Sequence, residues 1–243
     1  MSKKHSLKLN KIQVVILVGG FGKRLKQLTK DTPKPIISIK QKPFLFYLLN
    51  YLIKQGLNNF LFLAGYKGHK LNRYLNENFK RKKIKIKTYI ERKPMGTGYV
   101  LKKAYGKLEK KFLLLNGDTF TDINFRDFMK DVDNNKYLNI CITKKKSAAS
   151  GNFFIKKDKI LFIEKSKKVS GLINCGIYFI NKKIINVINK KESSLEKNTI
   201  PKLVKNNNVK LIKKNITLFD IGTLSGIKKF ENYLTIHKYL SKS

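Results

Sequence analysis

The apolar residues of this chain fall into short uncharged runs that are separated by stretches of mixed character. Val14–Leu17, Phe60–Ala64 and Phe112–Leu115 hold no polar residue at all, which is typical of strands buried on both faces of a sheet. Ile84–Ile90 instead alternates apolar residues with lysine, and this predicts a strand with one exposed face.

Predicted helices fill the intervals between these strands. They run from near Pro43 to about Gln55, over Lys67–Asn78 and over Thr97–Tyr105. This alternation predicts an α/β fold with a mostly parallel central sheet flanked by helices. Ligands of such sheets bind at the carboxyl ends of the strands, so we expect three following segments to converge on one site: Gly19–Arg24, Glu91–Gly98 and Gly117–Thr119.

The second half of the chain changes character. Strands are predicted at Tyr137–Thr143, Phe153–Ile155, Ile160–Glu164 and Leu172–Ile180, and helices at Lys182–Asn189, Leu195–Lys205 and Leu224–Leu240. There is no linker rich in Pro, Gly or Ser. We therefore expect one domain over residues 12–243 with two halves, about 12–125 and about 126–243, preceded by a basic extension over 1–11.

A glycine-rich, cationic loop follows the first predicted strand. Gly19, Gly20 and Gly22 allow the backbone to turn tightly and approach a ligand closely, and Arg24 and Lys34 bracket the loop with positive charge. Backbone N–H groups in such a loop can hold phosphates. An ordinary glycine turn after a strand is the alternative.

Known phosphate motifs do not match this loop. Gly22-Lys23 is followed by arginine rather than by the Ser or Thr of a Walker loop, and Leu25 stands where a dinucleotide fingerprint needs its third glycine. The flanking prolines of Pro33-Lys34-Pro35 fix the backbone and prevent a helix. A lysine presented so rigidly near a glycine loop is typical of a phosphate ligand.

The segments LVGGFGKRL, PKP and KPF, taken in this order, resemble the signature of the sugar-1-phosphate nucleotidyltransferases, G-G-x-G-T-R-L, P-K-P and K-P-[FM]. Lys23 stands where the family has threonine. The resemblance implies a Rossmann-like nucleotidyltransferase fold with a smaller sugar-binding lobe. It also implies that Arg24 and Lys34 act on the reacting phosphates, and that the nucleotide is bound by Leu17, Gly19, Gly20, Gly22 and Lys23.

Two aspartates are candidate metal ligands. Asp118 follows the buried run that ends at Leu115, and Asp220 precedes the last predicted helix. Either could instead form an Asx-turn or a helix N-cap. LLLNGDTF matches the family pattern L-x-[NG]-G-D, and FDIGT matches [WFI]-x-D-I-G-T. The resemblance therefore implies that both aspartates hold Mg²⁺, which prefers carboxylate oxygens together with phosphates and water.

Further segments resemble substrate loops of the same family. ERKPMGTG is similar to E-x-x-P-L-G-T-[AG]-G, which implies nucleotide contacts for Glu91, Gly96 and Thr97, although Thr97 could equally cap a helix. Three more segments correspond to the parts of the family that face the sugar: the pair Glu164-Lys165, GLINCGIY and SLEK. The residues implied to bind the sugar phosphate are Gly117, Glu164, Lys165, Asn174, Gly176 and Glu196. Because lysine is so common in this chain, the assignment of Lys165 to sugar-phosphate binding depends on its position alone.

The activity implied by the resemblance is transfer of a nucleotidyl group from an NTP to a sugar 1-phosphate, which releases pyrophosphate. The combined segments look most like the D-glycero-α-D-manno-heptose 1-phosphate guanylyltransferases, which favours GTP and that heptose phosphate and a role in surface polysaccharide synthesis. Mannose-1-phosphate guanylyltransferases, and uridylyl- and thymidylyltransferases of glucose or N-acetylmuramate type, share the same core and remain alternatives.

The charge of the chain allows a different class of protein. Its formal net charge is +39 over 243 residues, which could serve a basic RNA- or anion-binding protein without catalysis. Only five of the 54 basic residues are arginine, and the lysines are scattered. A nucleic-acid surface usually clusters charge and enriches arginine, so we expect a compositional origin and no specific nucleic-acid partner.

The remaining composition favours a cytoplasmic protein. Cys141 and Cys175 lie far apart in apolar runs, which predicts buried thiols in a reducing compartment. The polar start MSKKHSLKLNK has no apolar segment behind it, and no apolar run approaches the roughly 18 residues needed to span a bilayer. We therefore expect no secretory signal and no membrane insertion. The sequence leaves open whether the chain forms a homo-oligomer.

Overall fold

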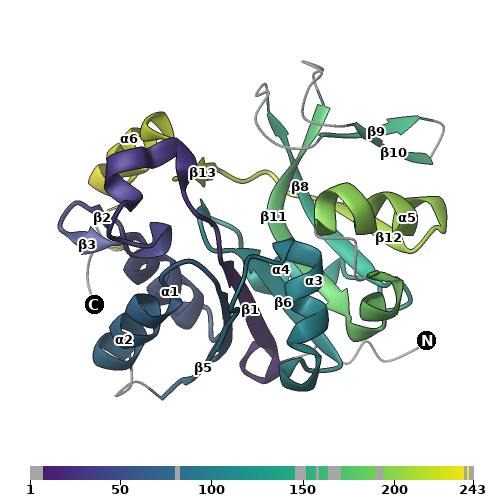
Figure 1. Ribbon diagram of the computed structural model, residues 1–243. Helices are drawn as coiled ribbons and strands as arrows, with labels where there is room; N and C mark the ends of the chain where they lie inside the picture. The colour runs from purple at the N-terminus through teal and green to yellow at the C-terminus, as the bar shows by residue number, and fades with distance from the viewer. Residues whose placement is uncertain are drawn as a thin grey trace.

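The computed structural model describes residues 8–79, 83–145, 152–156, 159–163, 171–189, 194–237 and 240. Among these residues nine strands form one sheet, whose central part is parallel (Figure 1). The order of that part is β6-β1-β4-β5. Its strands are β1 (Gln13–Val18), β4 (Asn59–Ala64), β5 (Lys85–Ile90) and β6 (Lys111–Asn116). All four were predicted from the hydrophobic pattern, and the parallel α/β core is confirmed.

Strand β1 lies between two parallel partners and is buried on both faces. Val14 pairs with Phe60 of β4 and with Leu113 of β6. Successive side chains of a strand point to opposite faces, so Val14 and Val15 belong to two separate hydrophobic clusters. Both are fully buried, which is why this run contains no polar residue.

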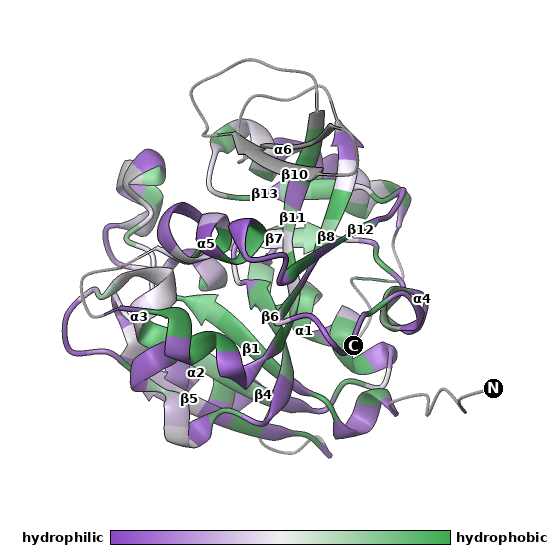
Figure 2. Ribbon diagram, turned by 90° about the vertical axis from the view of Figure 1, so that its right-hand side faces the viewer, coloured by the Kyte–Doolittle hydropathy of each residue, from purple (hydrophilic) through white to green (hydrophobic). Residues whose placement is uncertain are grey.

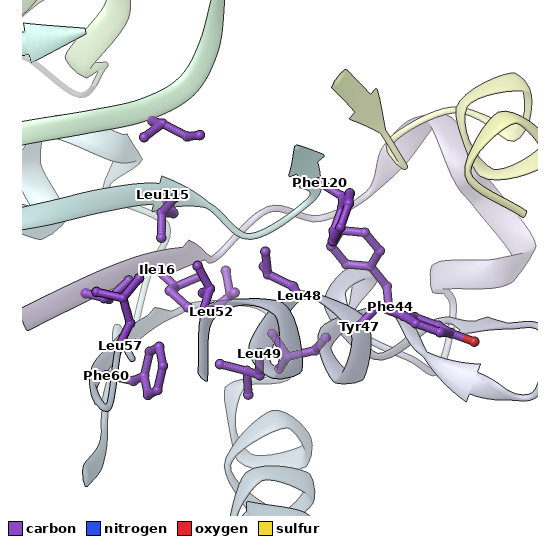
Figure 3. Packing of buried hydrophobic residues seen from close by; sticks show 14 of the residues in the cluster. Ile16, Phe44, Tyr47, Leu48, Leu49, Leu52, Leu57, Phe60, Leu115 and Phe120 are labelled. Atoms are coloured by element: carbon purple, nitrogen blue, oxygen red, sulfur yellow. The ribbon is translucent and has the colours of Figure 1, made fainter. Parts of the chain in front are cut away.

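Helices cover the two faces of the sheet, and in Figure 1 β1 runs between α1 and α2 on one side and α3 on the other. The α-helices are α1 (Phe44–Lys54), α2 (Gly68–Phe79), α3 (Gly96–Lys103), α4 (Phe125–Lys130), α5 (Ile200–Lys205) and α6 (Leu224–Ile236). Figure 3 shows Leu48 and Leu52 of α1 beside Ile16 and Leu115 of the sheet, while Tyr47 lies with Phe44 near Phe120.

The second half adds mainly antiparallel strands. The long strand β11 (Gly171–Asn181) runs antiparallel to β6 and also pairs with β8 (Leu138–Lys145) and β9 (Asn152–Lys156). Next come β10 (Lys159–Ile163), antiparallel to β9, and β12 (Val209–Lys213), parallel to β8. The first four were predicted; β12 was not, because it is a short edge strand that holds two lysines among five residues.

The helices of the second half differ from the prediction in detail. Lys182–Val187 forms a 3₁₀-helix (η5), and the predicted helix Leu195–Lys205 begins as a π-turn, η6 (Leu195–Thr199), before α5. Pro201 lacks the N–H that a regular α-helix needs at that position. The last helix ends at Ile236, where the His237 ring lies 4.0 Å from that of Tyr233.

Two small ribbons stand outside the main sheet. They are β2 (Ser38–Ile39) with β3 (Lys42–Pro43), and β7 (Thr119–Thr121) with β13 (Leu218–Asp220). The second ribbon pairs Asp220 with Thr119, and the N–H of Ile221 donates to the carbonyl oxygen of Asp118 at 3.0 Å. It therefore brings the two predicted metal ligands into the same part of the molecule, although 102 positions separate them in the sequence.

Short 3₁₀-helices complete the described chain. They are η1 (Leu9–Lys11), η2 (Lys23–Thr29), η3 (Lys34–Ile36) and η4 (Tyr105–Lys107). Leu9 is buried in the main core, as are the two free cysteines, Cys141 and Cys175. Figure 2 shows the hydrophobic residues gathered on β1, β4 and β6 inside the molecule. None of the helices that the structure describes is long and apolar enough to cross a membrane.

Candidate functional site

The carboxyl ends of β1, β5 and β6 open into one pocket of about 420 Å³. This is the convergence that the strand pattern predicted. The residues that line it are Leu17, Val18, Gly19, Gly20, Phe21, Lys34, Pro35, Glu91, Pro94, Gly96, Thr97, Asn116, Gly117, Asp118 and Glu196. Ten of them were predicted site residues. The other five were not predicted, although all of them lie within or beside the recognised motifs: Val18, Phe21, Pro35, Pro94 and Asn116.

The glycine loop is closed by a hydrogen bond to the helix that follows it. The Thr29 hydroxyl donates to the carbonyl oxygen of Gly22 at 3.1 Å. Gly22 has a φ of +65°, and a Cβ there would lie 2.5 Å from Cγ2 of Thr29. Only glycine fits this conformation and this contact. The loop is therefore held in one compact turn above the sheet.

Lys34 is the best-held cation of the pocket. Its Nζ lies 2.7 Å from Oδ2 of Asp118, and its side chain is only 12% exposed. Pro33 precedes it in extended backbone, and Pro35 follows it as a buried residue within η3. The lysine therefore enters the pocket from a rigid segment, as its flanking prolines predicted, and its charge is balanced by Asp118.

Arg24 and Asp220 form a second, more open pair beside the first. Nη2 of Arg24 lies 3.5 Å from Oδ2 of Asp220, with the two side chains 60% and 38% exposed. Gly222 joins the pairs: its N–H donates to Oδ1 of Asp220 at 2.7 Å. A Cβ on Gly222 would lie 2.8 Å from Nη2 of Arg24 and 3.2 Å from Nζ of Lys34. The two cations and Asp220 therefore meet around one backbone position.

Asp118 and Asp220 supply the oxygen ligands that suit Mg²⁺. Both are partly exposed carboxylates with a cationic partner, and hard divalent ions bind such oxygens together with phosphate oxygens and water. Within the described ranges no group of three or more His, Cys, Asp or Glu side chains could hold a metal by itself. The donor set therefore fits an ion that is shared with a phosphate substrate.

The Glu91 carboxylate lies where the ends of β1, β4 and β5 meet. Its Oε2 accepts a hydrogen bond from the N–H of Met95 at 3.0 Å. A Cβ on Gly19 or on Gly65 would lie 2.9 or 2.6 Å from its Oε1, so both glycines are needed to make room for the carboxylate. Burial raises the pKa of Glu91 above its usual value, and the Met95 hydrogen bond opposes that shift.

A chain of hydrogen bonds connects the two halves of the predicted site. The Thr97 hydroxyl, near the start of α3, donates to Oε2 of Glu196 at 2.9 Å. The Tyr178 hydroxyl donates to Oε1 at 3.4 Å and accepts from Nδ2 of Asn174 at 2.8 Å. Oδ1 of Asn174 in turn accepts from the N–H of Gly176 at 2.9 Å. Predicted nucleotide and sugar residues are therefore in direct contact.

Gly117 and Gly176 allow close approaches below the pocket. A Cβ on Gly117 would lie 2.4 Å from Cγ1 of Val18, and one on Gly176, which has a φ of +69°, would lie 2.6 Å from Nδ2 of Asn116. Of the other predicted site residues, Glu164 and Lys165 lie outside the described residues, as does the side chain of Lys23.

Tyr178, Ser194 and Gly222 are site residues that sequence reasoning missed. All three lie within motifs that were recognised, GLINCGIY, SLEK and FDIGT, but none was assigned a contact. Ser194 caps η6 and donates to Oε2 of Glu196 at 3.2 Å. Its position directly before Leu195-Glu196, where a cap is favoured, is the signal that could have identified it.

The model of the Nucleotidyl transferase family matches residues 13–236. The D-glycero-alpha-D-manno-heptose 1-phosphate guanylyltransferase of Campylobacter jejuni is 37% identical over 180 residues, which cover 72% of this chain and 78% of the relative. The enzyme of the same name from Aneurinibacillus thermoaerophilus is 31% identical over 228 residues, 92% of this chain and 98% of the relative.

Solved structures agree with these relatives. HddC from Yersinia pseudotuberculosis, complexed with GMP-PN, superimposes with a TM-score of 0.79 at 30% sequence identity, covering 92% of this chain and 99% of that one. A putative glucose-1-phosphate thymidylyltransferase from Bacillus anthracis has the same TM-score at 15% identity and so shows the shared fold alone. The predicted Rossmann-like nucleotidyltransferase fold is confirmed.

Proposed function

We propose that this chain, which belongs to the Nucleotidyl transferase family, transfers the guanylyl group of GTP to a manno-configured sugar 1-phosphate and releases pyrophosphate. D-glycero-α-D-manno-heptose 1-phosphate is the favoured acceptor, and mannose 1-phosphate is the alternative. The product would serve surface polysaccharide synthesis, and GTP and the sugar phosphate would meet the enzyme in the cytoplasm.

The observation that carries this proposal is the meeting of Lys34, Arg24, Asp118 and Asp220 at the edge of the pocket. In-line attack of a sugar phosphate oxygen on the α-phosphorus brings two anions together and expels a third. Such a step depends on positioning and charge neutralisation more than on covalent chemistry. Lys34 would contact the α-phosphate, and Arg24 the departing pyrophosphate. Backbone N–H groups of Gly19 to Gly22 would hold the remaining phosphate oxygens.

Asp118 and Asp220 would hold Mg²⁺. When bound, the ion would neutralise phosphate charge and orient the phosphate oxygens. Lys34 holds the Asp118 carboxylate in place at the pocket, because the two groups are only 2.7 Å apart. Gly222 performs the same positioning for Asp220 through its N–H.

The choice of GTP is supported by the acceptor chemistry of Glu91, which lines the pocket. Guanine presents its N1–H and its N2 amino group side by side, and a carboxylate can accept from both. Uracil and thymine present one N–H between two carbonyl oxygens, and the negative carboxylate would repel these oxygens. The relatives named above are called guanylyltransferases, in agreement with this choice.

Incubation of the protein with pooled NTPs, pooled sugar 1-phosphates and Mg²⁺, followed by mass spectrometry, tests the proposal. We expect one GDP-sugar, formed by the wild type and strongly reduced with Asp118→Asn. Lys205→Ala removes an exposed charge at the end of α5 and serves as the matched control. An RNA complex that survives physiological salt, together with no turnover of any NTP, would instead favour the basic binding protein.

A further inference from the structure

The carboxylate of Glu196 is held by three hydroxyl groups from three parts of the chain. Thr97 of α3 and Ser194 before η6 both donate to Oε2, and Tyr178 of β11 donates to Oε1. Because both oxygens have partners, the side chain is fixed in one orientation. Glu196 also lines the pocket, where a carboxylate accepts hydrogen bonds well from sugar hydroxyls.

The single proton of the Thr97 hydroxyl is used inside the protein. A hydroxyl has one proton to donate, and that of Thr97 goes to Glu196 at 2.9 Å, while its oxygen accepts from the N–H of Leu195 at 2.9 Å. In this arrangement it has no proton to offer to a nucleotide. Thr97 nonetheless belongs to the same loop as Glu91 and Gly96, for which nucleotide contacts were predicted.

The Tyr178 hydroxyl fixes the other oxygen of the Glu196 carboxylate, Oε1. Tyr178 is fully buried, and burial raises the pKa of its phenol, so the hydroxyl remains a neutral donor over the working pH range. Because its oxygen accepts from Asn174, its proton points to Glu196. The position of the carboxylate is therefore set on one side by the sugar half and on the other by Thr97.

We propose that Thr97 is a positioning residue for the sugar subsite, which fixes Glu196 to accept from a ring hydroxyl of the sugar 1-phosphate. This inference deepens the proposed function and rests on it.

Isosteric variants test this proposal. Thr97→Val keeps the shape and removes the hydroxyl, whereas Thr97→Ser restores it; Thr97→Ala is used if valine prevents folding. We expect Thr97→Val to raise the KM for the sugar 1-phosphate by at least about tenfold, because the hydrogen bond that it removes has a charged acceptor, and to leave the Kd for GTP, measured by calorimetry, within about twofold. Thr97→Ser should return the sugar KM nearly to wild type.

Thr199→Val is the matched control. The Thr199 hydroxyl is buried in the same turn as Glu196 and has no hydrogen-bond partner within the part of the chain that the structure describes. Its removal should leave both constants unchanged. Glu196→Gln should itself raise the sugar KM, and in that background Thr97→Val should add less than about twofold, because the two residues act through one contact.

Four results would overturn the proposal. Thr97→Val could raise the Kd for GTP and spare the sugar KM, which would make Thr97 a nucleotide ligand. It could change neither constant. It could also raise both constants by a similar factor while it lowers the thermal stability, which would indicate a general structural defect. Finally, a wild-type protein that forms no nucleotide-sugar would remove the proposed function and this inference with it, and that result is recognised because the wild type itself is inactive.

Discussion

Nζ of Lys34 lies 2.7 Å from Oδ2 of Asp118, and a proline stands on each side of the lysine. Because these prolines fix the backbone, the segment cannot shift to compensate for a changed side chain at position 34. We therefore expect Lys34→Ala to lower kcat by at least about 10²-fold, as is found when a preorganised charge at a phosphoryl centre is lost. Lys34→Arg should rescue little, because a planar fork does not replace a compact ammonium group. Pyrophosphate release at the wild-type rate in Lys34→Ala would exclude this role.

Asp118→Asn and Asp220→Asn should each lower the rate by at least about 10²-fold while the protein stays folded, because each removes one charged oxygen ligand of the proposed Mg²⁺ site. A steady-state assay over a range of Mg²⁺ concentrations checks this. Both variants should need more Mg²⁺ for half-maximal rate. Either variant with activity within threefold of wild type would lose its place in the metal site.

Gly222→Ala probes the position where the two ion pairs meet. The added Cβ would lie 2.7 Å from Oδ1 of Asp220 and 2.8 Å from Nη2 of Arg24, so one of these groups must move. We expect at least about a tenfold loss of kcat with little change in thermal stability, because the site is open. Gly106→Ala is the control, since its Cβ would meet nothing within 4 Å. Equal activity of the two variants would show that the cluster tolerates displacement.

Glu91→Gln tests the electrostatic cost of the buried carboxylate. Burial raises the pKa of Glu91 in the folded protein, so the folded state binds this proton more tightly than the unfolded state. The resulting stabilisation is complete below the unfolded pKa of about 4.5 and is lost as the pH rises through the folded pKa. Glutamine cannot ionise. Urea unfolding at pH 4 and pH 7 should therefore show that the variant gains stability relative to wild type at the higher pH; an unchanged difference would contradict the shift.

The parts of the fold and the site that depend on local pattern could be predicted from the sequence. Val14–Leu17 was recognisable as a buried strand because both its faces are covered, and Pro33 and Pro35 restrict Lys34 by their own covalent structure. The hydrogen bond between Thr97 and Glu196 could not be predicted, because it joins residues 99 positions apart and depends on how α3 meets η6. The π-turn η6 could not be predicted either, because hydrophobic spacing over Leu195–Lys205 does not distinguish it from the α-helix that follows.

The substrates of the transfer test the whole account most directly. The wild type is given GTP and Mg²⁺ with equal concentrations of D-glycero-α-D-manno-heptose 1-phosphate and mannose 1-phosphate, and both GDP-sugars and pyrophosphate are measured over time. We predict pyrophosphate in equal amount to the GDP-sugars, with the heptose product in excess, and slower reaction with UTP, CTP or dTTP. No GDP-sugar from either acceptor, or a faster reaction with another NTP, would contradict the account.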